Sequence, residues 1–362
     1  MSFRWAIAGT GAIAHQFAAA LGRLPDAELV AVGSRRQQTA DAFGERFGIP
    51  RRRRYSSYER LAADDGVDVV YVASPHSHHH RHTLLFLSAG RGVLCEKPFA
   101  LDAEQAAEMV VAAQTHGQFL MEAMWSRFLP AYVKIRELVA AGAIGTVLAV
   151  EGDFGFPRPV DPANRVFDLA QGGGALLDLG VYPVSLASML LGEPDRVVAL
   201  GQLGETGVDE QVAVLMGYHT GAVAVAKASL RASLACTGRV SGTEGSIELA
   251  TFMHCPDNLT VRRKSGTQRL YLPADSDVTA TDATATVGDI DGADRRNHRD
   301  RAAGGGLHHQ IRHVHFRLQA GHLDSDIMSQ AESVSVMRTL DAARAQIGLR
   351  YPATLMDGSR QS

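Results

Sequence analysis

The sequence predicts an α/β protein in which a doubly wound parallel sheet is followed by an α/β unit with an open, mostly antiparallel sheet. Three observations predict this fold class. Strand and helix signals alternate through the first third of the chain, and a glycine-rich turn, Gly9–Ala14, follows the first strand. Further along, short strand-like runs follow one another without helices between them. The 362 residues suit two domains, which we expect at residues 1–122 and 123–362.

Buried strands and amphipathic helices alternate in the first domain. Apolar runs predict strands, and residues such as Ile13, Phe17 and Leu21 recur at helical spacing. The predicted strands are Phe3–Ala8, Leu29–Gly33, Val67–Ala73 and Gly92–Cys95; the predicted helices begin near Ile13, span Ser57–Ala63 and follow His79. Such βαβ units build a parallel sheet that binds ligands at the carboxyl ends of its strands.

The second domain begins with a helix and a strand and continues as a succession of strands. A Gly172–Gly174 turn leads into a helix ending near Leu191. The other predicted elements are helices at Ala131–Ala141, 306–320 and 330–347, and strands at Val147–Phe156, Arg196–Leu203, Gln211–Gly217, Ala222–Ser229, Gly238–Gly242, Ser246–Leu249 and Leu259–Arg263. We expect residues 275–306, rich first in Asp, Thr and Ala and then in charges and glycine, to form an exposed mobile loop.

Composition excludes several classes of protein. A formal net charge of −3 argues against a nucleic-acid binder. No apolar run reaches the roughly 18 residues of a membrane span. The apolar stretch after Arg4 is interrupted by two glycines, so it predicts a strand and turn and not a signal peptide. The three widely spaced cysteines, Cys95, Cys236 and Cys255, suit a reducing compartment. We therefore expect a cytoplasmic protein.

The Gly9–Ala14 turn predicts dinucleotide binding in a Rossmann domain. Gly9 permits the tight turn, Gly11 lets the backbone approach a pyrophosphate, and Ala14 allows close helix packing. Ala12 and Ile13 open the helix whose positive end faces the phosphates.

The residues after the second strand predict which dinucleotide binds. An NAD site places Asp or Glu there for the ribose 2′-hydroxyl, whereas this chain has Ser34, Arg35 and Arg36. A hydroxyl and a guanidinium suit a 2′-phosphate, so NADP is preferred over NAD. The alternative is a solvated basic start to the next helix.

A lysine follows another buried strand. Glu96-Lys97-Pro98 comes directly after Cys95, which places Lys97 at the carboxyl edge of the sheet, beside the expected nicotinamide. Burial and neighbouring charges can tune such a lysine for proton chemistry.

Together these motifs make the chain resemble the glucose–fructose oxidoreductase / inositol dehydrogenase / MocA family. The family marks are Gly9–Ala14, Pro75–His79 and Glu96–Pro98. A narrower likeness, to the branch of dimeric dihydrodiol dehydrogenase and NADP-dependent D-xylose dehydrogenase, rests on Met121–Phe128, Gly172–Pro183, Gly242–Gly245 and Leu340–Pro352. The chain departs from its relatives at residues 277–306, so nothing is carried over there.

The resemblance implies roles for particular residues. Lys97 and Tyr182 would face the reacting carbon, with Tyr182 exchanging the proton and Lys97 tuning it. Asp178 would orient the substrate or Lys97, or would be a carboxylate favoured by a helix start. Pro75, His76, His79 and Glu96 would contact the cofactor, although relatives often have Asn in place of His76. It also implies a homodimer formed through open sheet faces.

Aromatic and basic residues in the second domain are candidates for the substrate pocket. Trp125 and Arg127 open that domain, and Phe154, Phe156 and Arg165 follow. An aromatic wall suits a sugar or diol ring, whereas the alternative for Trp125 is an interdomain core.

Two groups of histidines raise the question of a metal. They are His76, His78, His79, His80 and His82, and His308, His309, His313 and His315. No carboxylate or cysteine completes either group at ligand spacing, so we expect no metal site.

These expectations together predict an NADP-dependent dehydrogenase acting on a secondary alcohol of a sugar or trans-dihydrodiol. One alternative is a keto-sugar reductase of deoxysugar biosynthesis, which would run the same chemistry in reverse. Another is a non-catalytic NADP-binding regulator. Lys97 and Tyr182 together favour catalysis, because a regulator needs neither.

Overall fold

The computed structural model describes residues 2–275 and 305–352 of the chain. Its first sheet is parallel throughout and has the strand order β3-β2-β1-β4-β5-β6. This is the Rossmann order, so the predicted fold is confirmed for this part. The strands are β1 (Phe3–Ala8), β2 (Ala27–Gly33), β3 (Arg54–Tyr55), β4 (Val69–Val72), β5 (Gly92–Glu96) and β6 (Leu120–Ala123).

Helices cover both faces of this sheet, which is why its central strands are continuously apolar. All four residues of β4 are buried, as parallel strands between helical layers require. The helices are α1 (Ala12–Leu21), α2 (Gln37–Arg46), α3 (Tyr58–Ala62), α4 (His79–Ser88) and α5 (Ala103–His116). Helix α5 has an N-cap, because Asp102 accepts a hydrogen bond from the N–H of Gln105 at 2.8 Å.

The second sheet has eight strands in the order β14-β13-β12-β11-β7-β10-β9-β8. Every neighbouring pair is antiparallel except β7 and β10. The mostly antiparallel sheet expected from the sequence is therefore confirmed. Its strands are β7 (Val147–Gly155), β8 (Arg196–Leu203), β9 (Asp209–Gly217), β10 (Val223–Ser229), β11 (Gly238–Gly242), β12 (Gly245–Leu249), β13 (Asn258–Arg263) and β14 (Gly266–Tyr271).

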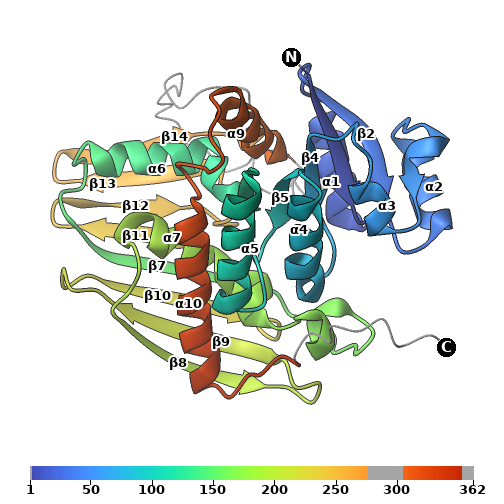
Figure 1. Ribbon diagram of the computed structural model, residues 1–362. Coiled ribbons are helices and arrows are strands. Elements are labelled where there is room, and N and C mark those ends of the chain that lie inside the picture. The colour runs from blue at the N-terminus through green and yellow to red at the C-terminus, as the bar shows by residue number, and fades with distance from the viewer. Residues whose placement is uncertain (1, 276–304, 353–362) are drawn as a thin grey trace.

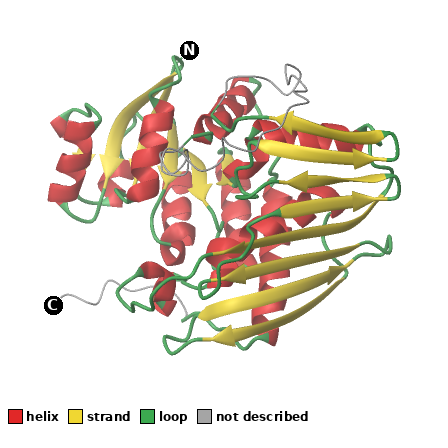
Figure 2. Ribbon diagram, turned by 180° about the vertical axis from the view of Figure 1, so that it is seen from behind, coloured by secondary structure: helices red, strands yellow, loops and turns green. Residues whose placement is uncertain are grey.

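Among the described residues, helices cover one face of the second sheet and leave the other uncovered. Figure 2 shows the strands in front and helices behind them, among them α6 (Pro130–Ala140), α7 (Val181–Leu191) and α10 (Gln330–Gln346). Buried and exposed residues alternate along β9, as in a sheet with one solvated face.

The last two helices run back toward the first sheet. Helix α9 (Leu307–Gln319) packs on α1, and its His315 Nε2 accepts a hydrogen bond from Trp5 Nε1 of β1 at 2.9 Å. Helix α10 packs on α5, α7 and β8. The two parts therefore share helical layers, and the predicted division at residue 122 stays a prediction. The predicted loop at 275–306 lies, but for its ends, outside the described residues.

One described segment, Leu169–Leu191, is long and apolar enough to cross a membrane, but 83% of its apolar window is buried inside the protein. It contains α7, which packs on β7 and β10. Its apolar character is therefore that of a core helix.

Candidate active site

A cavity of about 800 Å³ lies where the carboxyl edge of the first sheet meets the second. Most of the residues predicted for the site line it: Gly9, Gly11, Ala12, Ile13, Ser34, Arg35, Pro75, His76, His79, Glu96, Lys97, Trp125, Phe154, Phe156, Arg165, Asp178 and Tyr182. Arg36 and Arg127 do not. The predicted residues thus meet in one place, which is the edge where such sheets bind ligands.

At one end of the cavity, the glycine turn fits a dinucleotide. Gly9 has a φ of +121°, and a Cβ there would lie 2.6 Å from the carbonyl oxygen of Ala73. A Cβ at Gly11 would meet nothing within 4 Å, so the space over the start of α1 is open. No side chain caps this helix. Its first N–H groups are therefore available to a phosphate.

The neighbouring end of β2 is polar and carries no carboxylate. Ser34 Oγ is 2.7 Å from Thr39 Oγ1 and 3.4 Å from Thr10 Oγ1. Arg35 and Tyr58 line the same part of the cavity, and sequence reasoning missed Tyr58. Arg36 is the N-cap residue of α2 and lies outside the lining. In the described chain the cavity's two carboxylates are Glu96 and Asp178, at the catalytic end.

The histidines after β4 hold the cavity wall together. His76 Nδ1 lies 2.9 Å from the carbonyl of Gly172, and Arg165 donates to His76 Nε2 at 3.3 Å. Nε2 must therefore accept and Nδ1 must donate. Burial lowers the pKa of His76 to about 3, which matches this neutral tautomer. His79 lies 2.8 Å from both the Pro98 and the Ser74 carbonyls, and ties two loops of the first sheet together.

Other histidines of the two groups considered for a metal contact residues of this chain. His82 Nδ1 is 2.9 Å from Ser74 Oγ, and His315 contacts Asp26 as well as Trp5. Within residues 2–275 and 305–352, no group of three or more His, Cys, Asp or Glu is arranged to hold a metal ion.

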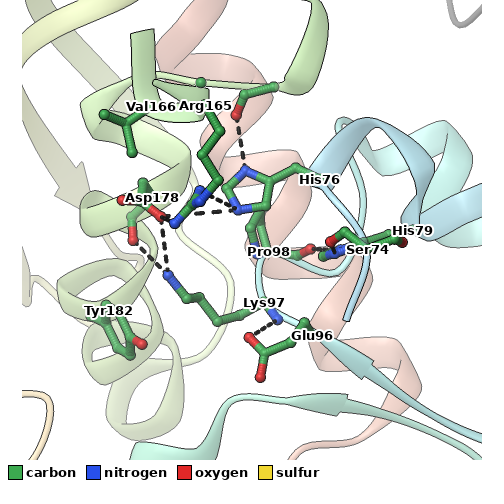
Figure 3. A network of polar contacts seen from close by, with 12 residues as sticks. Ser74, His76, His79, Glu96, Lys97, Pro98, Arg165, Val166, Asp178 and Tyr182 are labelled. Atoms are coloured by element: carbon green, nitrogen blue, oxygen red, sulfur yellow. Dashed lines mark hydrogen bonds and ion pairs between the residues drawn. The ribbon is translucent and has the colours of Figure 1, made fainter. Parts of the chain in front are cut away.

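Glu96 and Lys97 lie at the end of β5 (Figure 3). Glu96 accepts from the backbone N–H of Lys97 at 3.1 Å and from the hydroxyl of Tyr71. Burial raises the pKa of Glu96 despite these bonds. The pair fixes the backbone from which the Lys97 side chain extends.

Asp178 contacts the cationic side chains of both Lys97 and Arg165 (Figure 3). Lys97 Nζ donates to the Asp178 carbonyl at 2.8 Å and lies 3.5 Å from its Oδ1. Arg165 Nη2 donates to the same Oδ1 at 3.0 Å. Burial alone would raise the pKa of Asp178, but Lys97 and Arg165 hold it well below its usual value. Of the two readings of Asp178, these contacts favour the one that orients Lys97.

Tyr182 lies beside Lys97 on the second residue of α7. The lysine nitrogen sits 4.9 Å from the centre of its ring. Burial raises the pKa of Tyr182, and Lys97 is the strongest influence in the opposite direction. The phenol therefore holds its proton at neutral pH. Burial alone would lower the pKa of Lys97, but the anionic groups around it, Asp178 among them, outweigh burial and raise it, so Lys97 stays charged.

Aromatic rings form the wall facing these groups. Phe154 lies 5.5 Å from Tyr182 and 5.3 Å from Phe156, centre to centre. His254 and Phe252 complete the wall, and sequence reasoning missed both. The His254 ring is 4.4 Å from Phe154 and 5.2 Å from Tyr182. Phe252 has a φ of +65°, and no sequence signal marks this backbone conformation in a non-glycine residue.

The structure places Arg127 away from the cavity. Its side chain is fully buried, donates to the Oγ and the carbonyl of Ser185 at 2.8 Å, and lies 2.7 Å from Glu332. Glu332 is in the first turn of α10, so Arg127 links α7 to the C-terminal helix. This position gives Arg127 a structural role and does not support the predicted substrate contact.

Comparison with known proteins identifies the family. Residues 3–124 match the oxidoreductase family with an NAD-binding Rossmann fold, and residues 132–248 match the GFO/IDH/MocA C-terminal domain. The chain belongs to this oxidoreductase family. It is therefore an NAD(P)-dependent dehydrogenase or reductase, and the predicted resemblance is confirmed.

Relatives cover almost the whole chain. Trans-1,2-dihydrobenzene-1,2-diol dehydrogenase from Mus musculus is 36% identical over 97% of this chain and 99% of its own length. The protein of the same name from Xenopus laevis is 35% identical over 97% of this chain and all of its own length. A 3-ketoreductase from Actinomadura kijaniata, solved with NADP and TDP-benzene, shares the fold with a TM-score of 0.79 at 24% identity, covering 96% of this chain and 98% of its own.

Proposed function

We propose that the chain transfers a hydride between NADP and a secondary alcohol or carbonyl of a trans-dihydrodiol or sugar. The observation that carries the proposal is the meeting of Lys97, Asp178 and Tyr182 with an aromatic wall, at the end of a cavity that begins over a dinucleotide turn. NADP, when bound, would supply the hydride chemistry at its nicotinamide. The chain's residues supply binding and the proton.

The residues fit NADP in two respects. The open space over Gly11 and the uncapped start of α1 suit a pyrophosphate. Ser34 and Arg35 offer a hydroxyl and a guanidinium where a carboxylate would repel a 2′-phosphate. We therefore prefer NADP to NAD.

Tyr182 is the group that exchanges a proton with the substrate oxygen. Because its pKa is raised, the phenol is a donor at neutral pH and protonates the oxygen of a carbonyl during reduction. Oxidation needs the phenolate, so its rate increases with pH. Lys97 lies close enough to stabilise that phenolate.

The aromatic wall and the relatives guide the choice of substrate. Phe154, Phe156 and His254 offer flat apolar surface to an unsaturated ring. The mouse and frog relatives are named for a trans-dihydrodiol, so we place that class first and sugars second. Reduction of a keto-sugar is the second candidate, favoured by a phenol that keeps its proton at neutral pH. We also propose a cytoplasmic location.

NADPH formation from NADP⁺, followed by near-ultraviolet absorbance, tests the proposal. Wild type and Tyr182→Phe would be run against trans-dihydrodiols, aldoses and inositols, with keto-sugars and NADPH in the reverse assay. We expect wild type alone to turn over a trans-dihydrodiol or a sugar. Tight NADP⁺ binding without turnover of any substrate in either direction would contradict the proposal.

A further inference from the structure

The hydroxyl of Tyr182 has a protein hydrogen-bond donor that is not Lys97. Trp125 Nε1 lies 3.1 Å from the Tyr182 oxygen. Trp125 opens a short 3-10 helix, Trp125–Phe128, directly after β6, so a residue at the edge of the first sheet contacts helix α7 of the second part. An indole N–H can only donate. The direction of this bond is therefore fixed, and the phenol oxygen accepts.

This bond also determines where the phenol proton points. Trp125 is the hydrogen-bond partner of the Tyr182 hydroxyl within the described residues, and none of them accepts the proton of that hydroxyl. Tyr182 lines the cavity. Because the indole N–H occupies one lone pair of the Tyr182 oxygen, the hydroxyl proton can be donated to a group bound in the cavity.

The hydrogens of Lys97 are directed elsewhere. Its Nζ donates to the Asp178 carbonyl at 2.8 Å and contacts the Asp178 carboxylate (Figure 3). It lies 4.9 Å from the centre of the Tyr182 ring, and within the described residues no hydrogen bond joins it to the Tyr182 oxygen. Lys97 therefore acts on the phenol through its charge. Trp125 is the group that acts on it through a hydrogen bond.

We propose that Trp125 is a positioning residue for the proton transfer: its indole N–H holds the Tyr182 hydroxyl with the proton facing the substrate oxygen and stabilises the phenolate left when the proton has gone. This deepens the proposed function and rests on it. Trp125, which the sequence analysis assigned to the pocket wall, would then also orient the Tyr182 hydroxyl through its indole N–H.

The surroundings keep the indole in place. Its ring meets His254 edge-on at 5.8 Å and packs against the small cluster of Leu129, Cys255 and Ala274. A Cβ at Gly306 would lie 3.5 Å from the indole, so the start of α9 also closes on it. An indole packed on several sides keeps the direction of its N–H.

The charged and titratable groups around Tyr182 affect its proton as well. Lys97 and the Trp125 hydrogen bond lower the pKa of Tyr182, whereas burial raises it more. The other titratable groups that face it are Glu96, Asp178, Tyr71, Tyr132 and His254. Burial lowers the pKa of His254 to about 3, so His254 stays neutral through the range in which Tyr182 titrates.

Trp125→Phe removes the N–H and keeps an aromatic ring. We expect the alkaline midpoint of the kcat profile for alcohol oxidation to move up by about one pH unit, the size expected for one hydrogen bond to a charged acceptor. Oxidation near neutral pH falls about tenfold, because the phenolate fraction falls by that factor. NADP⁺ affinity stays unchanged, since the indole lies at the substrate end.

The chain offers a matched control. It contains two tryptophans, and the other, Trp5, also donates through Nε1, to His315 of α9; neither Trp5 nor His315 lines the cavity. Trp5→Phe removes an equivalent N–H and should leave the midpoint where it is. If Trp125→Phe folds, binds NADP⁺ and keeps the wild-type midpoint, the inference is wrong.

A measurement without turnover separates this inference from the proposed function. In Trp5→Phe, Trp125 is the sole tryptophan, and ionisation of a hydrogen-bonded tyrosine quenches its fluorescence. We expect an alkaline transition that Tyr182→Phe abolishes. That transition without turnover of any substrate would support the inference while the proposed function fails; no Tyr182-dependent transition would overturn the inference alone.

A second variant covers a loss of folding in Trp125→Phe. In the Trp5→Phe background, the remaining tryptophan can be replaced by benzothienylalanine, which has the shape of the indole ring with sulfur in place of N–H. The ultraviolet absorbance of the tyrosinate then reports the ionisation of Tyr182. We expect the same upward shift, and an unchanged midpoint would contradict the inference.

Discussion

The side chain of Lys97 is only 14% exposed, and the groups that contact its ammonium all lie at the catalytic end of the cavity. The carbonyl and carboxylate of Asp178 take its hydrogens, and the ring of Tyr182 lies beneath its charge. These partners compensate the cost of burying the ammonium. Removing the Lys97 side chain would disturb these partners whether its role is catalytic or only structural. Kinetic measurements are therefore needed to distinguish the two roles.

Lys97→Ala is expected to lower kcat by about 10²–10⁴-fold, because the phenolate of Tyr182 loses its compensating charge. The Kd for NADP⁺ should change little, since the glycine turn and Arg35 are untouched. Stopped-flow turnover and equilibrium titration of the cofactor measure the two quantities. A loss of cofactor binding equal to the loss of turnover would remove Lys97 from the proton chemistry.

Arg35 lines the cavity and Arg36 does not, which gives a matched pair of variants. Arg35→Asp removes a guanidinium and adds a charge that repels a 2′-phosphate, so the NADP/NAD ratio of kcat/KM should fall by roughly ten- to a hundredfold. Arg36→Asp changes the same charge one residue further on and should leave the ratio nearly unchanged. Equal effects of the two variants would show that the preference for NADP over NAD comes from general surface charge and not from a contact of Arg35.

At the scale of elements, a glycine turn sets the start of the segment that carries Asp178 and Tyr182. Gly174 has a φ of +119°, and a Cβ there would lie 2.0 Å from Asp209 Oδ1. Asp209 Oδ2 accepts from the N–H of Leu176 at 2.7 Å, where a π-helical turn, Leu176–Gly180, begins. The fully buried carboxyl on β9 therefore fixes the start of this segment.

Asp209 also predicts a pH dependence of stability. Burial raises its pKa to about 8, well above the value of an unfolded Asp. The folded chain then holds a proton that the unfolded chain has lost, so this group makes the fold less stable as pH rises from about 4 to about 8. Asp209→Asn keeps the acceptor for Leu176 and removes the titration. We expect its melting temperature to exceed that of wild type most at alkaline pH, in calorimetry across that range; a constant difference would contradict the assignment.

Elements were predictable where local pattern and packing agree. The buried runs of β1, β4 and β5 are visible in the sequence, because burial on both faces leaves a direct mark. Along β9 the sequence is apolar from Val212 to Met216, so its alternation of buried and exposed residues is seen only in the structure. Helix α5 was missed and α2 was given no bounds, because each buries only three residues, Ala106, Met109 and Ala113 in α5 and Ala40, Phe43 and Gly44 in α2. Strand β14 was missed because it buries Leu270 alone.

Site residues divide in the same way. The glycine turn and Glu96-Lys97-Pro98 could be predicted because backbone geometry at the end of a strand demands them. His254 and Phe252 lie between β12 and β13, and only tertiary packing directs them into the cavity. Arg127 could not be assigned from sequence, because its partner Glu332 is far along the chain.

At the scale of the whole molecule, the second sheet carries an apolar patch on β8, β9 and β10, on the face that no described helix covers. Register places Val198 opposite Leu215, and Leu200 and Val223 are on the same face. All four are well exposed to solvent: Val198 by 40%, Leu215 by 49%, Leu200 by 79% and Val223 by 46%. Some charges elsewhere on this face are paired within the chain, as Glu248 is with Arg239 and Arg262 and as Lys227 is with Asp153. An exposed apolar patch of this kind suits a second copy of the chain.

We propose that the protein is a homodimer through this face. Leu200→Glu combined with Leu215→Glu places two carboxylates in the patch, and we expect a monomer by analytical ultracentrifugation where wild type is a dimer. Neither Leu200 nor Leu215 lines the cavity, so turnover per chain should persist in the variant. Val111→Glu is the control, because Val111 is 60% exposed on α5, away from this sheet. A wild type that sediments as a monomer, or a double variant that remains dimeric while the control behaves like wild type, would show that this face is not the interface.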